Sequence, residues 1–154
     1  MVFMKNNKKL KILFLCTGNS CRSQMAESWT RRLKGDSIEA YSAGTEPRKL
    51  DPYAVKVMAE AGVDISMYHS KKIDEVKDIS FDFVVTVCDK AGENCPLFPG
   101  SAKIVHFGFD DPPKLAAAAK NEEEVLNCYR RVRDEIKSFA EQLPRILYRP
   151  DTNS

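Results

Sequence analysis

Short apolar runs alternate along the chain with longer segments in which apolar residues recur at helical spacing. The runs that predict strands are residues 10–16, 38–44, 81–88 and 103–109. Nearly continuous apolar strands indicate a sheet that is covered on both faces, which is typical of parallel sheets joined by helices. The pattern therefore predicts an α/β fold, a three-layer sandwich in which helices flank a four-stranded parallel sheet.

Amphipathic helices are predicted between or after the strands, over residues 23–35, 51–62 and 121–143. The second begins at Asp51, followed by a proline, which is a typical helix start. The third places Cys128 on its apolar face, so we expect this cysteine in the core. Ligands of parallel sheets bind beyond the carboxyl ends of the strands. Because Cys16 and Cys88 both end predicted strands, we expect them at one edge of the sheet.

The composition fits one ordinary domain. The chain has 154 residues, 43% apolar and 30% charged, with a formal net charge of +2, so the total charge favours neither nucleic acid nor membrane as a partner. It contains no apolar run of bilayer length and no signal-like order in its first residues, so we expect a cytoplasmic monomer. We expect one catalytic domain over residues 1–154, with a solvated leader at 1–9 and a loose tail at 145–154.

The residues between the first strand and the first helix have the composition of an anion-binding loop. Successive backbone N–H groups in such a loop form a concave anion site, and the helix N-terminus adds partial positive charge. Gly18 permits backbone angles that other residues avoid, and the planar guanidinium of Arg22 suits a tetrahedral oxyanion. The same field favours the thiolate of Cys16, to which Ser23 can donate a hydrogen bond. The oxyanion-binding residues are expected to be Thr17, Gly18, Asn19, Ser20, Cys21, Arg22 and Ser23.

The pattern C-x5-R-S between a strand and a helix resembles the low-molecular-weight protein tyrosine phosphatase family, whose loop has the form C-x5-R-[ST]. That family uses an aspartic acid before a proline as general acid, and the resemblance assigns this role to Asp111 in "FDDPP". Asp110 is the neighbouring alternative, and a plain Asp–Pro turn is the alternative without chemistry. For Cys16 and Arg22 the alternative is a strand-end cysteine beside a surface arginine.

The remaining cysteines bear on the substrate. Five cysteines without an extracellular signal argue against a disulfide framework. The segment from Cys88 to Cys95 lets two thiols meet if it moves. When Cys16 is bonded to a reducible centre, a second thiolate can attack the Cys16 sulfur and expel the reduced product. A third thiolate can then attack the resulting disulfide and free Cys16. Arsenic(V) is reducible in this way, whereas phosphorus(V) is not. Cys21 is expected to be an inert packed residue, with a second reactive thiol as the alternative.

The chain as a whole resembles the thioredoxin-coupled arsenate reductases, which have a low-molecular-weight phosphatase-like fold. The matching segments are "FLCTGNSCRSQMAE", "YSAG", "AVKVMAEAGVDIS", "VVTVCDKAGENCP" and "FGFDDPP", in that order. The resemblance implies that Cys16 is the nucleophile, Cys88 the second thiol and Cys95 the resolving thiol. It assigns the binding of the oxyanion to Arg22 and the role of general acid to Asp111. It also implies arsenate as substrate, phosphate or sulfate as competing oxyanions, no cofactor, and thioredoxin as electron donor, with glutaredoxin and glutathione as the alternative.

Some members of that family bind a potassium ion near the loop, and Asn19, Glu27 and Ser42 match positions of that site. The family's Thr-x-Asp ligands correspond here to His69 and Lys71. A lysine ammonium beside Glu27 would take the place of the cation, so we predict no metal site.

Two alternative functions follow from the same residues. A low-molecular-weight protein tyrosine phosphatase would share the loop and Asp111 but has no use for Cys88 and Cys95. A non-catalytic oxyanion-binding or redox-sensing domain would not need Asp111.

Overall fold

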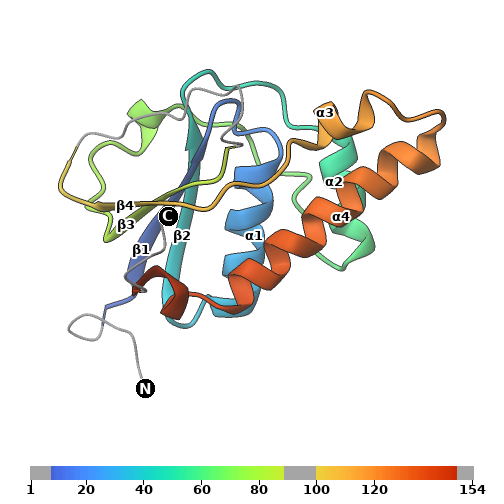
Figure 1. Cartoon of the computed structure of the whole chain (residues 1–154). Coiled ribbons are helices and arrows are strands. Elements are labelled where there is room, and N and C mark those ends of the chain that lie inside the picture. The colour runs from blue at the N-terminus through green and yellow to red at the C-terminus, as the bar shows by residue number, and fades with distance from the viewer. Residues whose placement is uncertain (1–7, 89–99, 149–154) are drawn as a thin grey trace.

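The computed structural model describes residues 8–88 and 100–148. Its centre is a sheet of four strands: β1 (Leu10–Cys16), β2 (Ile38–Gly44), β3 (Phe83–Thr86) and β4 (Lys103–His106). All neighbouring strands pair in parallel, in the order β2-β1-β3-β4 (Figure 1). The predicted α/β fold with a four-stranded parallel sheet is confirmed.

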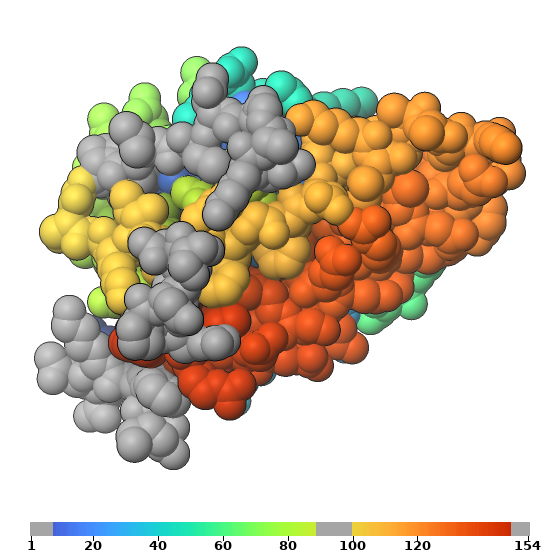
Figure 2. All heavy atoms as spheres, viewed as in Figure 1, coloured from blue at the N-terminus to red at the C-terminus, as the bar shows by residue number. Residues whose placement is uncertain are grey.

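Two long helices cover one face of the sheet. They are α1 (Arg22–Lys34) and α4 (Glu122–Glu141), which pack on each other, and α2 (Pro52–Glu60) lies against α4 (Figure 1). Figure 2 shows α4, in orange-red, beside the short α3 (Pro112–Ala116), which also contacts it. Phe14 of β1 forms part of the fully buried core beneath these helices. This layer brings the N-terminus of α1 to the end of β1.

The opposite face of the sheet is covered by the chain between α2 and β3. This segment includes one turn of 3₁₀ helix, η1 (Ile73–Glu75). Leu13 and Val84 of the sheet pack on this side against Val76 and Phe81 of the segment. Both faces are therefore buried, as the continuous apolar strands predicted.

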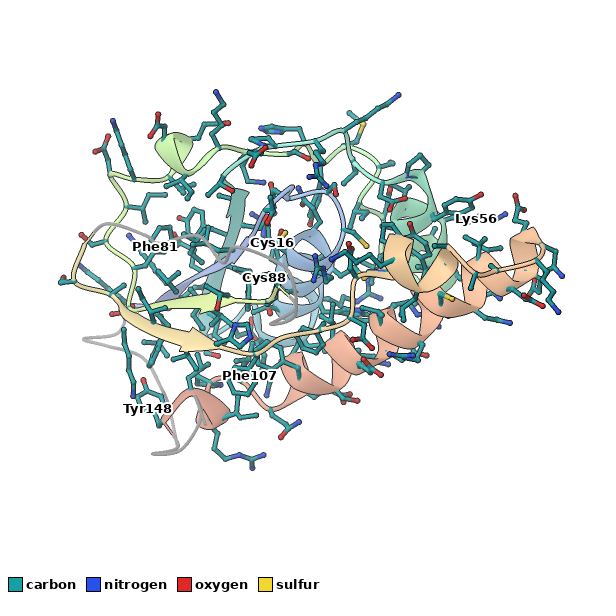
Figure 3. All side chains as sticks on the ribbon, turned by 45° about the horizontal axis from the view of Figure 1, so that its top comes forward. Cys16, Lys56, Phe81, Cys88, Phe107 and Tyr148 are labelled. Atoms are coloured by element: carbon teal, nitrogen blue, oxygen red, sulfur yellow. The ribbon has the colours of Figure 1, made fainter. Side chains whose placement is uncertain are left out.

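The carboxyl edge of the sheet carries the two cysteines that were expected there. Cys16, at the end of β1, pairs in register with Gly44 at the end of β2. On the other side of β1, the Val87 amide donates to the Leu15 carbonyl at 2.9 Å, so the pairing with β1 continues past the end of β3. Cys88 follows immediately, and Figure 3 shows it at the same edge as Cys16.

Two strands end earlier than the sequence predicts, and one cysteine is less buried than expected. β3 ends at Thr86 and β4 at His106, before the predicted ends at residues 88 and 109, although backbone hydrogen bonds continue the pairing past both ends. Cys128 is half-buried rather than in the core, since Leu126 and Tyr129 take the buried positions of α4.

The end of the described chain is packed. Residues 145–148, expected within a loose tail, form the 3₁₀ helix η2 (Arg145–Tyr148), in which Ile146 and Leu147 are buried. None of the helices within residues 8–88 and 100–148 has the length and apolarity needed to span a bilayer.

Candidate active site

Cys16 is a buried free thiol at the point where β1 becomes the loop. Its sulfur lies 3.0 Å from the hydroxyl oxygen of Ser23. That oxygen accepts a hydrogen bond of 2.8 Å from Nδ2 of Asn19, which leaves the hydroxyl hydrogen of Ser23 for the sulfur. The structure therefore contains the Cys16–Ser23 contact that the sequence suggested.

Asn19 sets the shape of the loop. It has a φ of 48°, in the left-handed region, which asparagine tolerates better than most residues. The freedom that glycine offers at position 18 is not used for a positive φ, and within the loop the residue with a positive φ is Asn19. The Asn19 side-chain oxygen accepts from the Lys71 backbone N–H at 2.8 Å and from Nε2 of Gln24 at 3.1 Å. These two donors orient the amide so that its nitrogen faces Ser23.

The carbonyl groups of the loop are bonded from its outer side. Amides of the segment after β2 donate bonds of 2.9–3.0 Å to three of them: Glu46 to Thr17, Arg48 to Gly18, and Asp51 to Ser20. The Asn19 carbonyl accepts from the Ser70 hydroxyl at 2.7 Å and from the Gln24 amide at 3.0 Å. In a trans peptide the C=O and the next N–H point in opposite directions. The amides of residues 18–21 are thereby turned inward, as an anion-binding concavity requires.

The start of α1 adds to this concavity. The helix begins at Arg22, and its N-cap Cys21 makes no side-chain capping hydrogen bond. Amides of an uncapped first turn are available to an anion, and the helix dipole favours negative charge there. The buried guanidinium of Arg22 donates from Nη1 to the Phe109 carbonyl at 3.0 Å, and its Nη2 lies 3.5 Å from Oδ1 of Asp111.

The two neighbouring aspartates face different partners. Asp111 is the N-cap residue of α3, but its side chain makes no capping bond, and its carboxylate lies beside Arg22 with 20% of the side chain exposed. Asp110 is paired with Arg131 on the exposed side of α4. Of the two, Asp111 is therefore the one placed to donate a proton within the site.

Cys88 is fully buried and disulfide-bonded. The free thiols of the described residues are Cys16, Cys21 and Cys128. Cys95, the predicted resolving thiol, lies outside the described residues.

Cys21 lies within the loop and is buried. Burial, followed by the charges of Asp51 and Cys16, raises the pKa of the Cys21 thiol well above its ordinary value, and the opposing effect of Arg22 is smaller. Cys21 is therefore held as a neutral thiol at physiological pH, which supports the inert role expected for it.

Gly44 is a site residue to which the sequence analysis assigned no role, although it ends the quoted "YSAG". A Cβ on Gly44 would lie 2.5 Å from the Thr17 carbonyl oxygen and 2.9 Å from the Asn19 nitrogen. Its own N–H donates to the Lys71 carbonyl at 2.8 Å. Gly44 thus allows β2 and the 69–71 segment to support the loop at close range. A glycine that ends a strand at the ligand edge is the signal that could have found it.

The residues of the predicted cation position do not fit a potassium ion. The buried carboxylate of Glu27 accepts from the Ser42 hydroxyl at 2.5 Å and pairs with Arg31 at 2.7 Å. Nζ of Lys71 lies 3.7 Å from the same carboxylate and donates to the His69 carbonyl at 3.2 Å. The ammonium group of Lys71 therefore lies at this position, and it would repel a potassium ion there. Within the described part of the chain, no cluster of three or more His, Cys, Asp or Glu could hold a metal.

Comparison with known proteins identifies the family. The model of the low molecular weight phosphotyrosine protein phosphatase family matches residues 11–151. The chain belongs to this family. An arsenate reductase of Halalkalibacterium halodurans is 50% identical over 139 residues, which are 88% of this chain and 97% of that protein. The family predicted from the loop and the quoted segments is confirmed.

Two solved structures of family members are informative. One described as an arsenate reductase in the phosphate binding state has a TM-score of 0.67 and 31% identity, covering 87% of this chain and 95% of that one. A thioredoxin-dependent arsenate reductase of Corynebacterium glutamicum has a TM-score of 0.53 and 28% identity, covering 84% of this chain and 61% of that one.

The raised pKa of Cys21 predicts selective labelling by iodoacetamide. At neutral pH we expect Cys21 to remain unmodified while the half-buried Cys128 reacts, because only the thiolate is nucleophilic. Labelling of Cys21 should rise only at alkaline pH. Peptide mass spectrometry measures both sites, and the chain unfolded in guanidinium provides the control in which both react alike. Equal rates in the folded protein would contradict the prediction.

The position of Lys71 predicts that potassium does not specifically stabilise the folded protein. Potassium chloride should change the melting temperature of this protein no more than sodium chloride at the same ionic strength. Lys71→Asp removes the ammonium and adds a carboxylate beside Glu27, so a potassium-specific rise in melting temperature should appear. Lys72→Asp makes the same charge change at an exposed neighbour and should not create it. A potassium-specific rise in the unmodified protein would contradict this account.

Proposed function

We propose that this family member is an arsenate reductase, which converts arsenate to arsenite by a relay of Cys16, Cys88 and Cys95 and is reset by thioredoxin. The observation that carries the proposal is the state of the cysteines. Cys88 is disulfide-bonded, while Cys16, at the end of the adjacent strand, is a free thiol. A cysteine that lies at the same sheet edge as Cys16 and forms a disulfide is what the later steps of the relay require.

Arsenate binds in the concavity as a tetrahedral oxyanion. The inward amides of residues 18–21 and the guanidinium of Arg22 donate to its oxygens. Phosphate and sulfate have the same shape and compete, which accords with the relative described in a phosphate binding state. The buried surroundings strengthen each of these interactions, because the local dielectric is low.

In the first step the Cys16 thiolate attacks arsenic. An arsenic–sulfur bond forms, and one oxygen of arsenate leaves as water after Asp111 has supplied a proton. Ser23 donates a hydrogen bond to the attacking sulfur, and Arg22 balances the charge of the remaining oxygens.

In the second step the Cys88 thiolate attacks the sulfur of Cys16. The sulfur–arsenic bond breaks and its electron pair goes to arsenic, which leaves as arsenite, arsenic(III). Cys95 then attacks Cys88, frees the Cys16 thiolate and leaves a Cys88–Cys95 disulfide. Two thiols have been oxidised and arsenic has gained two electrons.

Thioredoxin is the proposed source of the two electrons that reopen the disulfide. A structural relative described as thioredoxin-dependent supports this choice over glutaredoxin with glutathione. A reducing cytoplasm is the compartment in which such a donor keeps the relay running. We propose a monomer, and a net charge of +2 gives no reason to expect nucleic acid as a partner.

Phosphatase activity is the second candidate. Cys16, Arg22 and Asp111 are sufficient for attack on a phosphate ester followed by hydrolysis by water, and the chain belongs to a phosphatase family. We expect this activity to be slow beside arsenate reduction, since it leaves Cys88 and Cys95 without a role. A non-catalytic oxyanion-binding or redox-sensing domain is the remaining alternative.

The relay is tested by NADPH consumption with arsenate, thioredoxin and thioredoxin reductase. The unmodified protein should turn over steadily, and Cys95→Ser should stop after a single turnover, because Cys16 stays trapped in a disulfide with Cys88. Cys128→Ser is the matched control and should retain full activity.

Replacing thioredoxin with glutaredoxin and glutathione distinguishes the two donors. If arsenate causes no NADPH consumption with either donor, while an aryl phosphate is hydrolysed briskly, the chain functions as a phosphatase.

The acid role is tested by comparing Asp111→Asn with Asp110→Asn. Loss of a general acid lowers the rate of the first step by about 10²-fold or more, so Asp111→Asn should slow arsenate-dependent oxidation of Cys16 by that factor. Asp110→Asn breaks only an exposed ion pair and should keep the rate within about threefold. Rapid-quench measurement of the first turnover gives both values. The assignment is wrong if the two variants show the opposite order.

A further inference from the structure

Residues 107–111 run from the end of β4 to Asp111, the proposed acid, and we call this segment the acid strap. On the face shown in Figure 2 the chain after β4 runs, in yellow to orange, beside α4. The strap continues the pairing of the sheet: the Phe107 amide donates to the Thr86 carbonyl at 2.9 Å, and the Phe109 amide to the Val87 carbonyl at 3.2 Å. It is therefore bonded to the chain that leads directly to Cys88.

Gly108 lies in the middle of this contact. A Cβ built on Gly108 would lie 2.9 Å from the carbonyl oxygen of Cys88 and 3.0 Å from Nε2 of His106. The first neighbour is a backbone atom and has no rotamer by which to move away. The second belongs to a ring whose Nδ1 lies 2.7 Å from the Thr86 hydroxyl. Any side chain at position 108 would therefore displace the strap from Cys88.

The strap holds two parts of the active site. The Phe109 carbonyl accepts the hydrogen bond from Nη1 of Arg22, and the Asp111 carboxylate lies beside Nη2 of the same guanidinium. The other side of the strap is fixed, since the rings of Phe107 and Phe109 pack on Phe139 of α4 with centroids 4.9 and 5.7 Å away. A shift of the backbone at Gly108 would thus move both groups that face Arg22.

We propose that Gly108 is a positioning residue. Its lack of a side chain lets the acid strap lie against the backbone of Cys88, and in this position the strap holds Arg22 and Asp111 for the oxyanion. The same contact ties the place of the second thiol to that of the guanidinium. The inference deepens the proposed function, but its first test, the binding of phosphate, requires neither arsenate nor reduction.

The test is Gly108→Ala in the full chain. Isothermal titration with inorganic phosphate should show a Kd raised about tenfold, because a hydrogen bond that orients a charged donor is lost. The first turnover with arsenate should show a raised KM. A correctly placed acid makes the rate fall at alkaline pH, and this fall should be absent in the variant. Damage that is only structural would lower the melting temperature without moving either readout.

Gly35→Ala is the matched control, because a Cβ there would also meet a backbone oxygen, that of Arg31 at 2.5 Å, at the far end of α1. It should leave the phosphate Kd unchanged. An unchanged Kd and pH profile in Gly108→Ala would overturn the proposal. If that variant does not fold, Phe109→Pro removes the amide bond to Val87 without adding atoms against Cys88. It should weaken phosphate binding similarly, and an unchanged Kd would again overturn the proposal.

The two proposals fail in different ways. Absence of arsenate-dependent NADPH consumption in the unmodified protein counts against the reductase relay alone. Unaltered phosphate affinity in the strap variants counts against the role of Gly108 alone.

Discussion

The site depends on one constraint: the carbonyl groups of the oxyanion loop are bonded from outside, so its amides must face inward. A peptide group cannot turn its C=O outward without turning the next N–H inward. Bonds from the segment after β2, from Gln24 and from Ser70 hold four successive carbonyls, and Gly44 lets β2 approach closely enough to allow this. The donors are thus arranged before the anion arrives, and no reorganisation is needed when charge develops.

A buried polar network beneath the loop supports this arrangement. Asn19, Ser23, Gln24 and Ser42 are completely buried, and each has a hydrogen-bond partner among its neighbours. A buried network of this kind fixes one conformation when every member is satisfied and is costly when one is lost. The buried carboxylate of Glu27 also has partners within the chain, because Arg31 and Lys71 compensate its charge.

Local sequence pattern was sufficient for β1 and the start of α1, because strand, loop and helix signals are consecutive there, whereas Asp111 was assigned only through the resemblance to a known family. It failed where distant segments decide the conformation. The left-handed backbone of Asn19 is stabilised by the Lys71 amide, far along the chain, and no pattern near Gly18 indicates which of the two residues will adopt it. The close contact at Gly108 arises in the same way, from the carbonyl of Cys88 just beyond the end of β3.

Parallel pairing explains how one fold can serve both hydrolysis and reduction. In the proposed function the loop and Arg22 bind a tetrahedral oxyanion, Asp111 supplies a proton, and attack by Cys16 on phosphorus can only be completed by water. β1 and β3 are adjacent and in register, so a residue just beyond β3 lies at the edge where Cys16 begins the loop. A thiol just beyond β3 offers a second route, because it can attack the sulfur of Cys16 instead of the oxyanion centre. This attack is productive only when the centre accepts two electrons. The step from phosphatase to reductase therefore needs no new binding site, only a thiol at the neighbouring strand end and a further one to release it.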